Sequence, residues 1–572
     1  MLDVSIRNGT VVDGRGAPGR RADVGIRDGR IVALGDIDEP ALATVDADDL
    51  LVTPGFVDPH THYDAQLFWD PAASPSNVHG VTSVIGGNCG FTLAPIKPRD
   101  ADYLRRMMTK VEGMPLAALE HGVDWQWHTF GDYLDRLDGN IGVNAGFLVG
   151  HCALRRYVMG EASIGNVATP EQIASMVELL HESIRAGGLG FSTSLSRTHS
   201  DGDGEPVPSR WATHEEVLAL CSAVSEHDGT TLEAIVDGCL DMFSDEEIEL
   251  LATMSAAGRR PLNWNVLTID SSVPERIERQ LTASTRAQEI GGRVVALTMP
   301  VQVPMNMSFR TYCALFMLPD WGQVLNLPVP ERIAKLRDPS VRAWLDERAR
   351  APEAGVFRRL ADWKNYVLGD VYAEANAGLK GRKIADIAAE RGAAPFDVLL
   401  DIVTADELAT ILWPIPPDGD AKSWELRASV WSDPRALLGG SDAGAHLDRM
   451  CGAPYTTRFV GDCLRGRKLV PVERAVQLIT DAPARLFGLR ERGRIEVGWH
   501  ADVCVIDPDS VGADHATLVA DLPGGSARLT AEAQGVRHVF VNGIETVRDN
   551  EPTGALPGRV LRSGTDTDTV LP

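Results

Sequence analysis

The stretch that decides the fold is Thr53-Pro54-Gly55-Phe56-Val57-Asp58-Pro59-His60-Thr61-His62. It opens with a Pro-Gly turn, continues through a short apolar run and ends with two histidines one residue apart. Side chains at positions i and i+2 of a β-strand point to the same side, so His60 and His62 can offer two imidazoles to one metal ion. The pattern predicts a metal-binding strand, and the alternative is a pair of surface histidines.

Beyond this strand, apolar β-type runs alternate with helices that begin at capping sequences such as Thr169–Gln172 and Ser244–Glu247. The expected β-runs end near His60, Cys89, Gly150, Ser192, Glu233, Asn265, Thr298 and Asp442. Eight β-runs separated mostly by helices predict an α/β fold, a parallel (β/α)8 TIM-like barrel over residues 53–489. Residues from about 304 to 434 are too many for one connection, so we interpret them as a helical insertion before the last barrel strand.

The two ends of the chain have a different pattern. Short β-type runs in residues 1–52 and 490–572 end at turn sequences such as Asn8-Gly9 and Asn542-Gly543, which tolerate positive φ. We therefore expect a small β-sandwich domain built from both termini. The polar tail from about Gly564 is expected to be loose.

Composition narrows the classes of function. The 572 residues are 44% hydrophobic and 24% charged, as in an ordinary globular protein. The formal net charge of −25 disfavours nucleic acid and anionic membranes as partners. The eight cysteines show no CxxC spacing, and no signal-type or membrane-spanning apolar run is evident. We expect a cytoplasmic protein that acts on a small molecule, with homo-oligomerisation left open.

A second chemical signal lies at the expected last strand. Asp442 follows the run Leu437-Leu438-Gly439-Gly440-Ser441. A carboxylate at the end of a barrel strand can ligate a metal and take a proton from a bound water. An Asx-turn that closes the strand is the alternative, and for this aspartate taken alone it is the stronger interpretation.

Taken together, these motifs resemble the amidohydrolase superfamily. Within it the chain is most similar to the N-acyl-D-amino acid deacylases, or D-aminoacylases, through residues 80–91 with Asn88-Cys89-Gly90 and through residues 188–193. The resemblance implies an enzyme, a hydrolase of non-peptide C–N (amide) bonds that uses a metal-bound water with Asp442 as proton shuttle. It also implies a zinc ion held by His60, His62, Cys89 and Asp442.

Two of the matching residues have a structural alternative. Cys89, as a thiolate, would be a zinc ligand, and a buried free thiol is the other interpretation. His151, in the similar stretch of residues 149–155, is expected either to contact substrate or a ligand or to be a satisfied core histidine.

The chain departs from the family at strands five and six. D-aminoacylases carry a metal-binding histidine at the end of each, whereas residues 230–236 and 261–268 contain none. Glu233 falls at the first position and Val266, which cannot ligate a metal, at the second. Glu233 offers a carboxylate as metal or substrate ligand instead. We therefore expect one firmly bound divalent ion and a second that is weak or lost.

Two other functions stay open. One is an amidohydrolase reaction on a cyclic amide, carbamate or urea-like bond. The other is a catalytically silent scaffold, because two ligand histidines are missing, although the retained set favours an enzyme. A substrate carboxylate would need a cation, and the candidates are Arg155, Arg197, Arg310 and Arg458.

Overall fold

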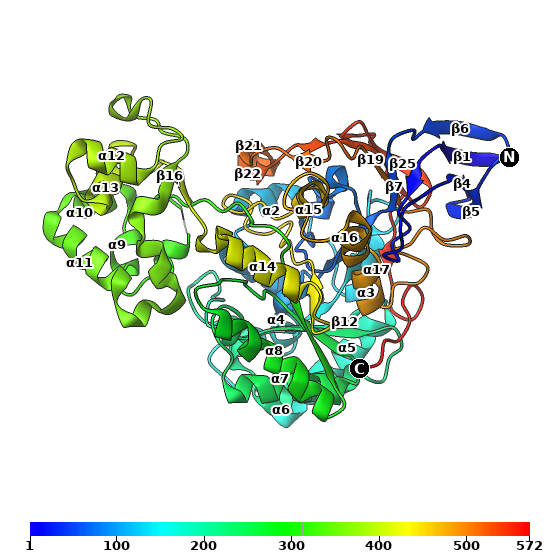
Figure 1. The fold of residues 1–572 in the computed structure, drawn as a ribbon. Coiled ribbons are helices and arrows are strands. Elements are labelled where there is room, and N and C mark those ends of the chain that lie inside the picture. Colours follow the sequence, from blue (N-terminus) through cyan, green and yellow to red (C-terminus); the bar gives the residue numbers. More distant parts are fainter. Residues whose placement is uncertain (312) are drawn as a thin grey trace. The chain divides into compact units, whose positions relative to one another are not determined.

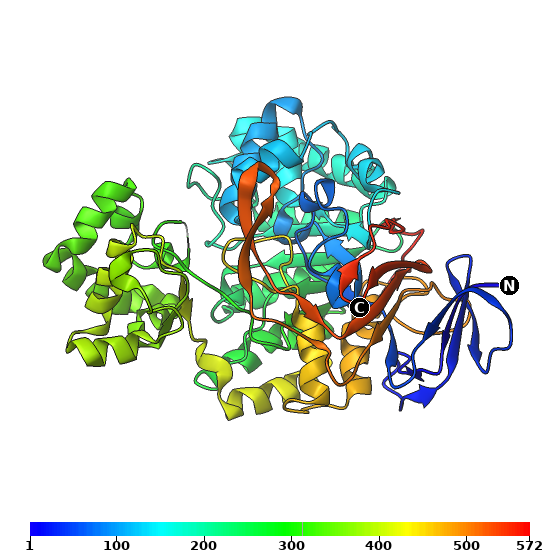
Figure 2. The ribbon, with the colours of Figure 1, turned by 90° about the horizontal axis from the view of Figure 1, so that it is seen from above.

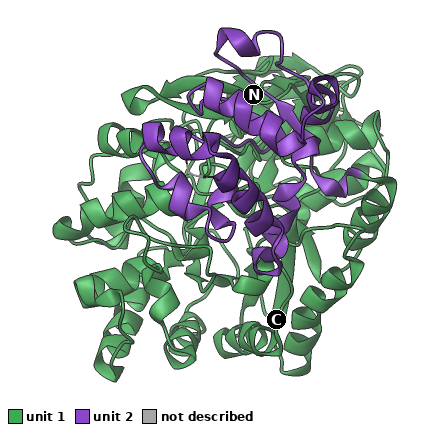
Figure 3. Ribbon diagram, turned by 90° about the vertical axis from the view of Figure 1, so that its left-hand side faces the viewer, with its two compact units in different colours: residues 1–303, 420–572 green, residues 304–419 purple. Residues whose placement is uncertain are grey.

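The computed structural model describes residues 1–311 and 313–572. The chain forms two compact units, one of Met1–Val303 with Asp420–Pro572 and one of Pro304–Gly419 (Figure 3). The second unit therefore interrupts the first between two of its strands. Helix α14 (Ala421–Val430) belongs to the first unit, so the compact insertion is shorter than the stretch of about 304–434 expected from the sequence.

Parallel strands form the centre of the first unit. One sheet contains β8, β9 and β10, and a second contains β11, β12, β13, β14, β15 and β18 in that order. Their bounds are Phe56–Asp58, Val81–Gly86, Asn144–Phe147, Val149–Gly150, Gly190–Ser194, Thr231–Ile235, Pro261–Trp264, Arg293–Thr298 and Ala436–Leu438. Each of the eight expected β-runs is present, with β10 and β11 forming one run, and each ends within a few residues of its expected position.

The first and last of these strands meet just beyond their ends. Thr61 and Ala443 form a parallel bridge, and the His62 N–H donates to the Ala443 carbonyl at 2.7 Å. The Asp442 N–H donates to the His60 carbonyl at 3.3 Å. The backbone segments that carry the predicted ligands of β8 and β18 are thus hydrogen-bonded to each other.

Helices connect consecutive parallel strands (Figure 1). Between β9 and β10 lie α1 (Ala101–Val111), α2 (Leu116–Gly122) and α3 (Phe130–Leu137), and α4 (His151–Met159) follows β11. The next helices are α5 (Pro170–Arg185), α6 (His214–Val224), α7 (Asp245–Gly258) and α8 (Pro274–Glu289). The capping boxes expected at the starts of α5 and α7 are both formed. After β18 come α15 (Tyr455–Leu464), α16 (Val472–Ile479) and α17 (Asp481–Leu486).

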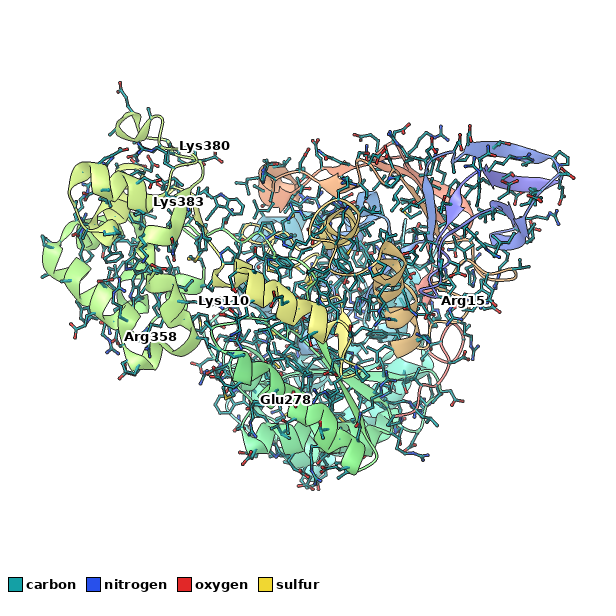
Figure 4. All side chains as sticks on the ribbon, in the orientation of Figure 1. Arg15, Lys110, Glu278, Arg358, Lys380 and Lys383 are labelled. Atoms are coloured by element: carbon teal, nitrogen blue, oxygen red, sulfur yellow. The ribbon has the colours of Figure 1, made fainter. Side chains whose placement is uncertain are left out.

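Strands from both termini share a sheet. Its order is β26-β25-β24-β19-β7-β2-β3, and β19 (Val503–Ile506) pairs with β7 (Leu51–Pro54) on one side and β24 (Val536–Val541) on the other (Figure 2). The remaining strands of this sheet are β2 (Thr10–Val11), β3 (Arg20–Arg21), β25 (Ile544–Arg548) and β26 (Glu551–Pro552). Arg15, labelled in Figure 4, pairs with Glu496 at 2.5 Å and adds a further link between the two ends of the chain.

A second sheet of N-terminal strands packs on the same core. Its order is β5-β4-β1-β6, with bounds Arg30–Gly35, Asp23–Arg27, Leu2–Arg7 and Ala41–Asp46. Val4 and Ile6 from this sheet share a buried cluster with Val503 and Phe540. The turn residues Asn8 and Asn542 have φ of 65° and 48°, as their Asn-Gly sequences predict.

The C-terminal tail differs from expectation. β27 (Val560–Leu561) leaves the terminal β-sheets and pairs in parallel with β10. Thr567 is 1% exposed and its hydroxyl donates to the Gly229 carbonyl at 2.6 Å. Polar composition suggested a loose tail, but here the polar groups bond to backbone carbonyls and hold the tail in place.

The second unit is mainly helical and has its own core. Its helices are α9 (Gly322–Leu325), α10 (Val329–Arg337), α11 (Pro339–Arg350), α12 (Ile384–Arg391) and α13 (Pro395–Ala405), with a hairpin of β16 (Tyr366–Leu368) and β17 (Leu412–Pro414). Trp363 stacks on Trp321 and Phe396, with centroid distances of 5.6 and 4.6 Å. Within the described residues, no helix combines the length and apolar character needed to cross a membrane.

Candidate metal centre

The four residues predicted to hold a metal converge beyond the ends of β8, β9 and β18. The Cys89 Sγ lies 3.6 Å from the His60 Nε2. The Asp442 Oδ1 lies 3.3 Å from the His60 Nε2 and 3.8 Å from the His62 Nε2. Ligand atoms bound at about 2.0–2.3 Å to one tetrahedral ion are roughly 3.3–3.6 Å apart. The observed separations are close to that spacing, so the donor set fits one divalent ion.

The cluster is buried and its hydrogen-bonding capacity is not used up. His60 is 0%, His62 2% and Cys89 6% exposed. The Nδ1 atoms of both histidines and the Glu233 Oε1 have no hydrogen-bond partner among the described residues. A buried polar atom without a partner costs about 1–3 kcal/mol. The unpaired Glu233 oxygen lies beside these metal-type ligands and is open to a cation, whereas the imidazole nitrogens that approach the other ligands are the Nε2 atoms.

The backbone around Cys89 is held in an uncommon conformation. Cys89 has φ of 54° and Asp442 φ of 53°, both in the left-handed region that costs a non-glycine residue about 1–3 kcal/mol. The Ser192 hydroxyl donates to the Gly87 carbonyl at 2.5 Å and accepts from the Gly90 N–H at 3.1 Å. Two of the four predicted ligands therefore depend on their surroundings to keep their backbone in place.

Glu233 lies directly against this turn. Its Oε2 accepts the Cys89 N–H at 2.7 Å, and the whole side chain is buried. Burial and the nearby Asp442 carboxylate raise the pKa of Glu233 well above its ordinary value. The residue at the family's strand-five histidine position thus contacts the predicted thiolate ligand.

Asp442 is held by Asn265, the residue that directly follows strand β14. The Asn265 Nδ2 donates to the Asp442 Oδ1 at 3.0 Å. Burial, with a smaller contribution from Asp58, raises the pKa of Asp442 to about 7. The Asp58 carboxylate accepts a hydrogen bond from the Ser441 hydroxyl, beside Asp442. A carboxyl group with a pKa near neutrality is suited to accepting and releasing a proton.

Three further residues at the site were missed from the sequence. Glu112, at the end of α1, places its Oε1 3.4 Å from the His62 Nδ1, and its carbonyl accepts the His446 N–H. Asn265 ends an expected strand and follows Asn263-Trp264, so a search of strand ends would have found it. His446 lies four residues after Asp442, so the same search of strand ends would have found it. Glu112 belongs to no recognisable local motif.

His151 lies in a separate buried network. Its Nδ1 bonds to the Thr193 hydroxyl at 2.8 Å and its Nε2 to the Glu216 carboxylate at 2.9 Å. The Arg155 guanidinium donates to the same carboxylate at 2.6 Å. Both ring nitrogens are therefore used within the protein. The structure favours the core-histidine interpretation over a metal or substrate contact.

The structure also reduces the number of arginines that are candidates for binding a substrate carboxylate. Arg155 is fully buried against Glu216, and Arg458 donates to the Asp514 carbonyl at 2.7 Å. Arg310 belongs to the second unit, and Arg197 is exposed on the loop after β12. The charge of Arg155, one of the candidate partners for a substrate carboxylate, is already neutralised by Glu216.

Comparison with known proteins agrees with this geometry. A family model described as the amidohydrolase family matches residues 43–547. The D-aminoacylase of Alcaligenes xylosoxydans xylosoxydans is 30% identical over 572 residues, which cover 98% of this chain and 97% of that protein.

Two solved structures are similar along nearly the whole chain. One is a D-aminoacylase structure from work on its binuclear metal centre, on one-metal activation and second-metal attenuation. It is 25% identical, has a TM-score of 0.62, and the match covers 98% of this chain and 100% of that one. The other is the N-acyl-D-glutamate deacylase of Bordetella bronchiseptica with zinc and a phosphonate that mimics the tetrahedral intermediate. It is 25% identical with a TM-score of 0.64, at the same coverage. The chain therefore belongs to the amidohydrolase family.

Proposed function

We propose that this chain is a metal-dependent hydrolase that cleaves the amide bond of N-acyl-D-amino acids. The observation that carries this proposal is the buried cluster of His60, His62 and Cys89, with the partly exposed Asp442 carboxylate 3.3 Å from the His60 Nε2. The full-length similarity to D-aminoacylase supports the substrate class.

We also infer that the parallel strands close into an eight-stranded barrel. The pairings run without a break from β8 to β10 and from β11 to β18, and only Leu148 separates β10 from β11. The bridge between Thr61 and Ala443 supports pairing of the first strand with the last. In such a barrel the ligand-bearing ends of the strands lie on one face, where enzymes of this architecture have their active sites.

The donor set fits zinc better than a hard cation, because it combines two imidazoles and a thiol with one carboxylate. When bound, a divalent ion there supplies a Lewis acid that polarises the scissile carbonyl and acidifies water. His60, His62 and Cys89 would hold the ion. Asp442 would contribute an oxygen, because its Oδ1 lies near the Nε2 atoms of both histidines.

Asp442 moves the proton. As a carboxylate it accepts a proton from the attacking water, and as an acid it donates that proton to the leaving nitrogen. The hydrogen bond from Asn265 holds one carboxylate oxygen and leaves the other for this transfer. Burial of His60, His62 and Cys89 keeps bulk water away from their side of the carboxylate.

Glu233 is proposed to define a second, weaker cation position next to Cys89. Its Oε1 is buried without a hydrogen-bond partner, while its Oε2 is already occupied by the Cys89 N–H. Val266, at the other family histidine position, supplies no donor. A single carboxylate oxygen in place of two imidazoles explains why the first ion is expected to bind much more firmly than the second.

The test is hydrolysis by the purified, zinc-loaded protein of N-acyl-D-amino acids, their L-enantiomers and cyclic imides. We expect turnover of the D-enantiomers, its loss on chelation and its return on adding zinc. Preference for cyclic imides would move the assignment to another amidohydrolase reaction. Less than about a tenth of an equivalent of bound metal, with no turnover, would indicate a silent scaffold.

A further inference from the structure

We propose that Glu112 is a positioning residue that orients His62 for metal binding. The inference rests on the proposed function, since it concerns the same metal centre. It assigns a role to a carboxylate at the end of α1, a helix between β9 and β10, whereas the predicted ligands lie at the ends of strands. Lys110, labelled in Figure 4, marks this end of the helix.

The first step concerns which nitrogen of His62 faces the ion. The Nε2 atoms of His60 and His62 both approach the Asp442 Oδ1, at 3.3 and 3.8 Å. Nε2 of His62 is therefore the atom that lies on the ion side. Its Nδ1 is the outer nitrogen, and the Glu112 Oε1 lies 3.4 Å from that atom.

The second step concerns what a metal-bound imidazole needs on its outer side. A ligating histidine nearly always gives its other N–H to a carboxylate, a carbonyl or water, which fixes the tautomer and raises the basicity of the ligand. The His62 Nδ1 makes no hydrogen bond to the described residues. The Glu112 Oε1 at 3.4 Å is thus the carboxylate oxygen placed to accept this proton once the imidazole and the carboxylate are aligned.

The third step concerns what holds Glu112 itself. Its side chain is 3% exposed. Its N–H donates to the Met108 carbonyl at 3.0 Å at the end of α1, and its carbonyl accepts the His446 N–H. One residue thus contacts the segment after β8 through its side chain and the segment after β18 through its backbone. Glu112 is fixed relative to both ligand-bearing segments before any ion arrives.

The test compares Glu112→Ala and Glu112→Gln with a matched control, Glu120→Gln on the exposed face of α2. Zinc affinity is measured by competition with a chromophoric chelator, and the visible spectrum is recorded for the cobalt-loaded proteins. We expect E112A to bind zinc roughly 10–100-fold more weakly, the usual effect of losing such a partner. E112Q keeps the shape but not the charge, so about a fivefold loss is expected. E120Q should match the wild type.

Thermal unfolding of the metal-free proteins separates orientation from folding. We expect the metal-free E112Q protein to melt as the wild type does while its cobalt spectrum changes. Wild-type zinc affinity and an unchanged cobalt spectrum in E112Q would overturn the inference. This outcome counts even if the E112A protein fails to fold. A wild-type protein without zinc affinity would overturn the proposed function together with this inference. If the wild type binds zinc and E112Q has the same zinc affinity and cobalt spectrum, only the role of Glu112 is overturned.

Discussion

Two buried polar clusters lie in the first unit and differ in one respect. In the network of His151, Glu216 and Arg155, both nitrogens of the imidazole and both oxygens of the carboxylate have protein partners. In the cluster of His60, His62, Cys89 and Asp442, both histidines keep an Nδ1 without a hydrogen bond to the described residues. Both clusters are largely buried, although the Asp442 side chain is 23% exposed, and they differ in whether both nitrogens of each imidazole have protein partners.

The difference separates a structural role from a chemical one. A network that satisfies itself has nothing to offer a ligand, and its loss damages folding. A cluster of metal-type donors that lie close together without satisfying one another keeps ligand atoms available to a cation. The same residue type, a fully buried histidine, therefore has opposite roles in the two places, and each of the following predictions tests that distinction.

The largest effect is expected for the catalytic carboxylate. Asp442→Asn should lower kcat for an N-acyl-D-amino acid about 10²–10⁴-fold at saturating zinc, because the proton acceptor is removed. The free energy of unfolding should change little, since amide and carboxylate have the same shape. Steady-state assays with metal analysis check this. Hydrolysis at near the wild-type rate would remove Asp442 from the mechanism.

The opposite pattern is expected in the structural network. Glu216→Ala leaves the Arg155 guanidinium buried without its carboxylate and should lower the free energy of unfolding by about 3–5 kcal/mol. Zinc bound per folded molecule should stay at the wild-type level. Urea denaturation and elemental analysis measure the two quantities. A loss of zinc without a loss of stability would reverse the roles of the clusters.

Another buried histidine, His79, allows a pH test of histidines whose two nitrogens both have protein partners. His79 bonds to the Thr457 hydroxyl and the Ala531 carbonyl, and burial lowers its pKa to about 4. The unfolded chain, with a pKa of about 6.5, binds the proton more readily. The contribution of His79 to the free energy of unfolding should therefore be constant above about pH 7 and fall between about pH 6.5 and 4, by at most about 3 kcal/mol.

The His79→Gln variant isolates this contribution from other titrating groups. Its unfolding free energy should depend less on pH in that window than that of the wild type. His121→Gln, at an exposed position on α2, is the matched control and should keep the wild-type slope. Equal slopes in the wild type and H79Q would contradict the assignment of His79 as a neutral buried histidine.

The smallest effect is expected for the residue that holds Asp442. Asn265→Ala removes the 3.0 Å hydrogen bond to the Asp442 Oδ1 but no reacting group. We expect kcat to fall about tenfold, the value of one hydrogen bond to a charged group. Zinc content should not change. A loss as large as that in D442N would make Asn265 a participant in the reaction and not a support.

The local patterns of the sequence predicted most of the framework. The capping sequences at Thr169 and Ser244 and the Asn-Gly turns depend only on neighbouring residues, and the structure has them where they were expected. The stretch from Thr53 to His62 and the Asn-Cys-Gly turn likewise placed three of the converging side chains. The tail differed from its expected loose state, because Thr567 is held by a hydrogen bond to Gly229, a residue remote in sequence.

Side-chain partners could not be predicted in the same way. Whether His151 serves chemistry or folding depends on Glu216, which is 65 residues away in the first turn of α6. Glu112 reaches His62 only because α1 ends beside the segment after β18. Both facts depend on tertiary packing, which neither periodicity nor spacing encodes.

The most direct test of the central claim is X-ray absorption spectroscopy at the zinc edge of the zinc-loaded protein, with Cys89→Ser as control. The account predicts one sulfur ligand at about 2.3 Å with nitrogen and oxygen ligands at about 2.0–2.1 Å, and loss of the sulfur shell in C89S. A zinc environment of nitrogen and oxygen alone, unchanged in C89S, would contradict the assembly of this centre from His60, His62, Cys89 and Asp442.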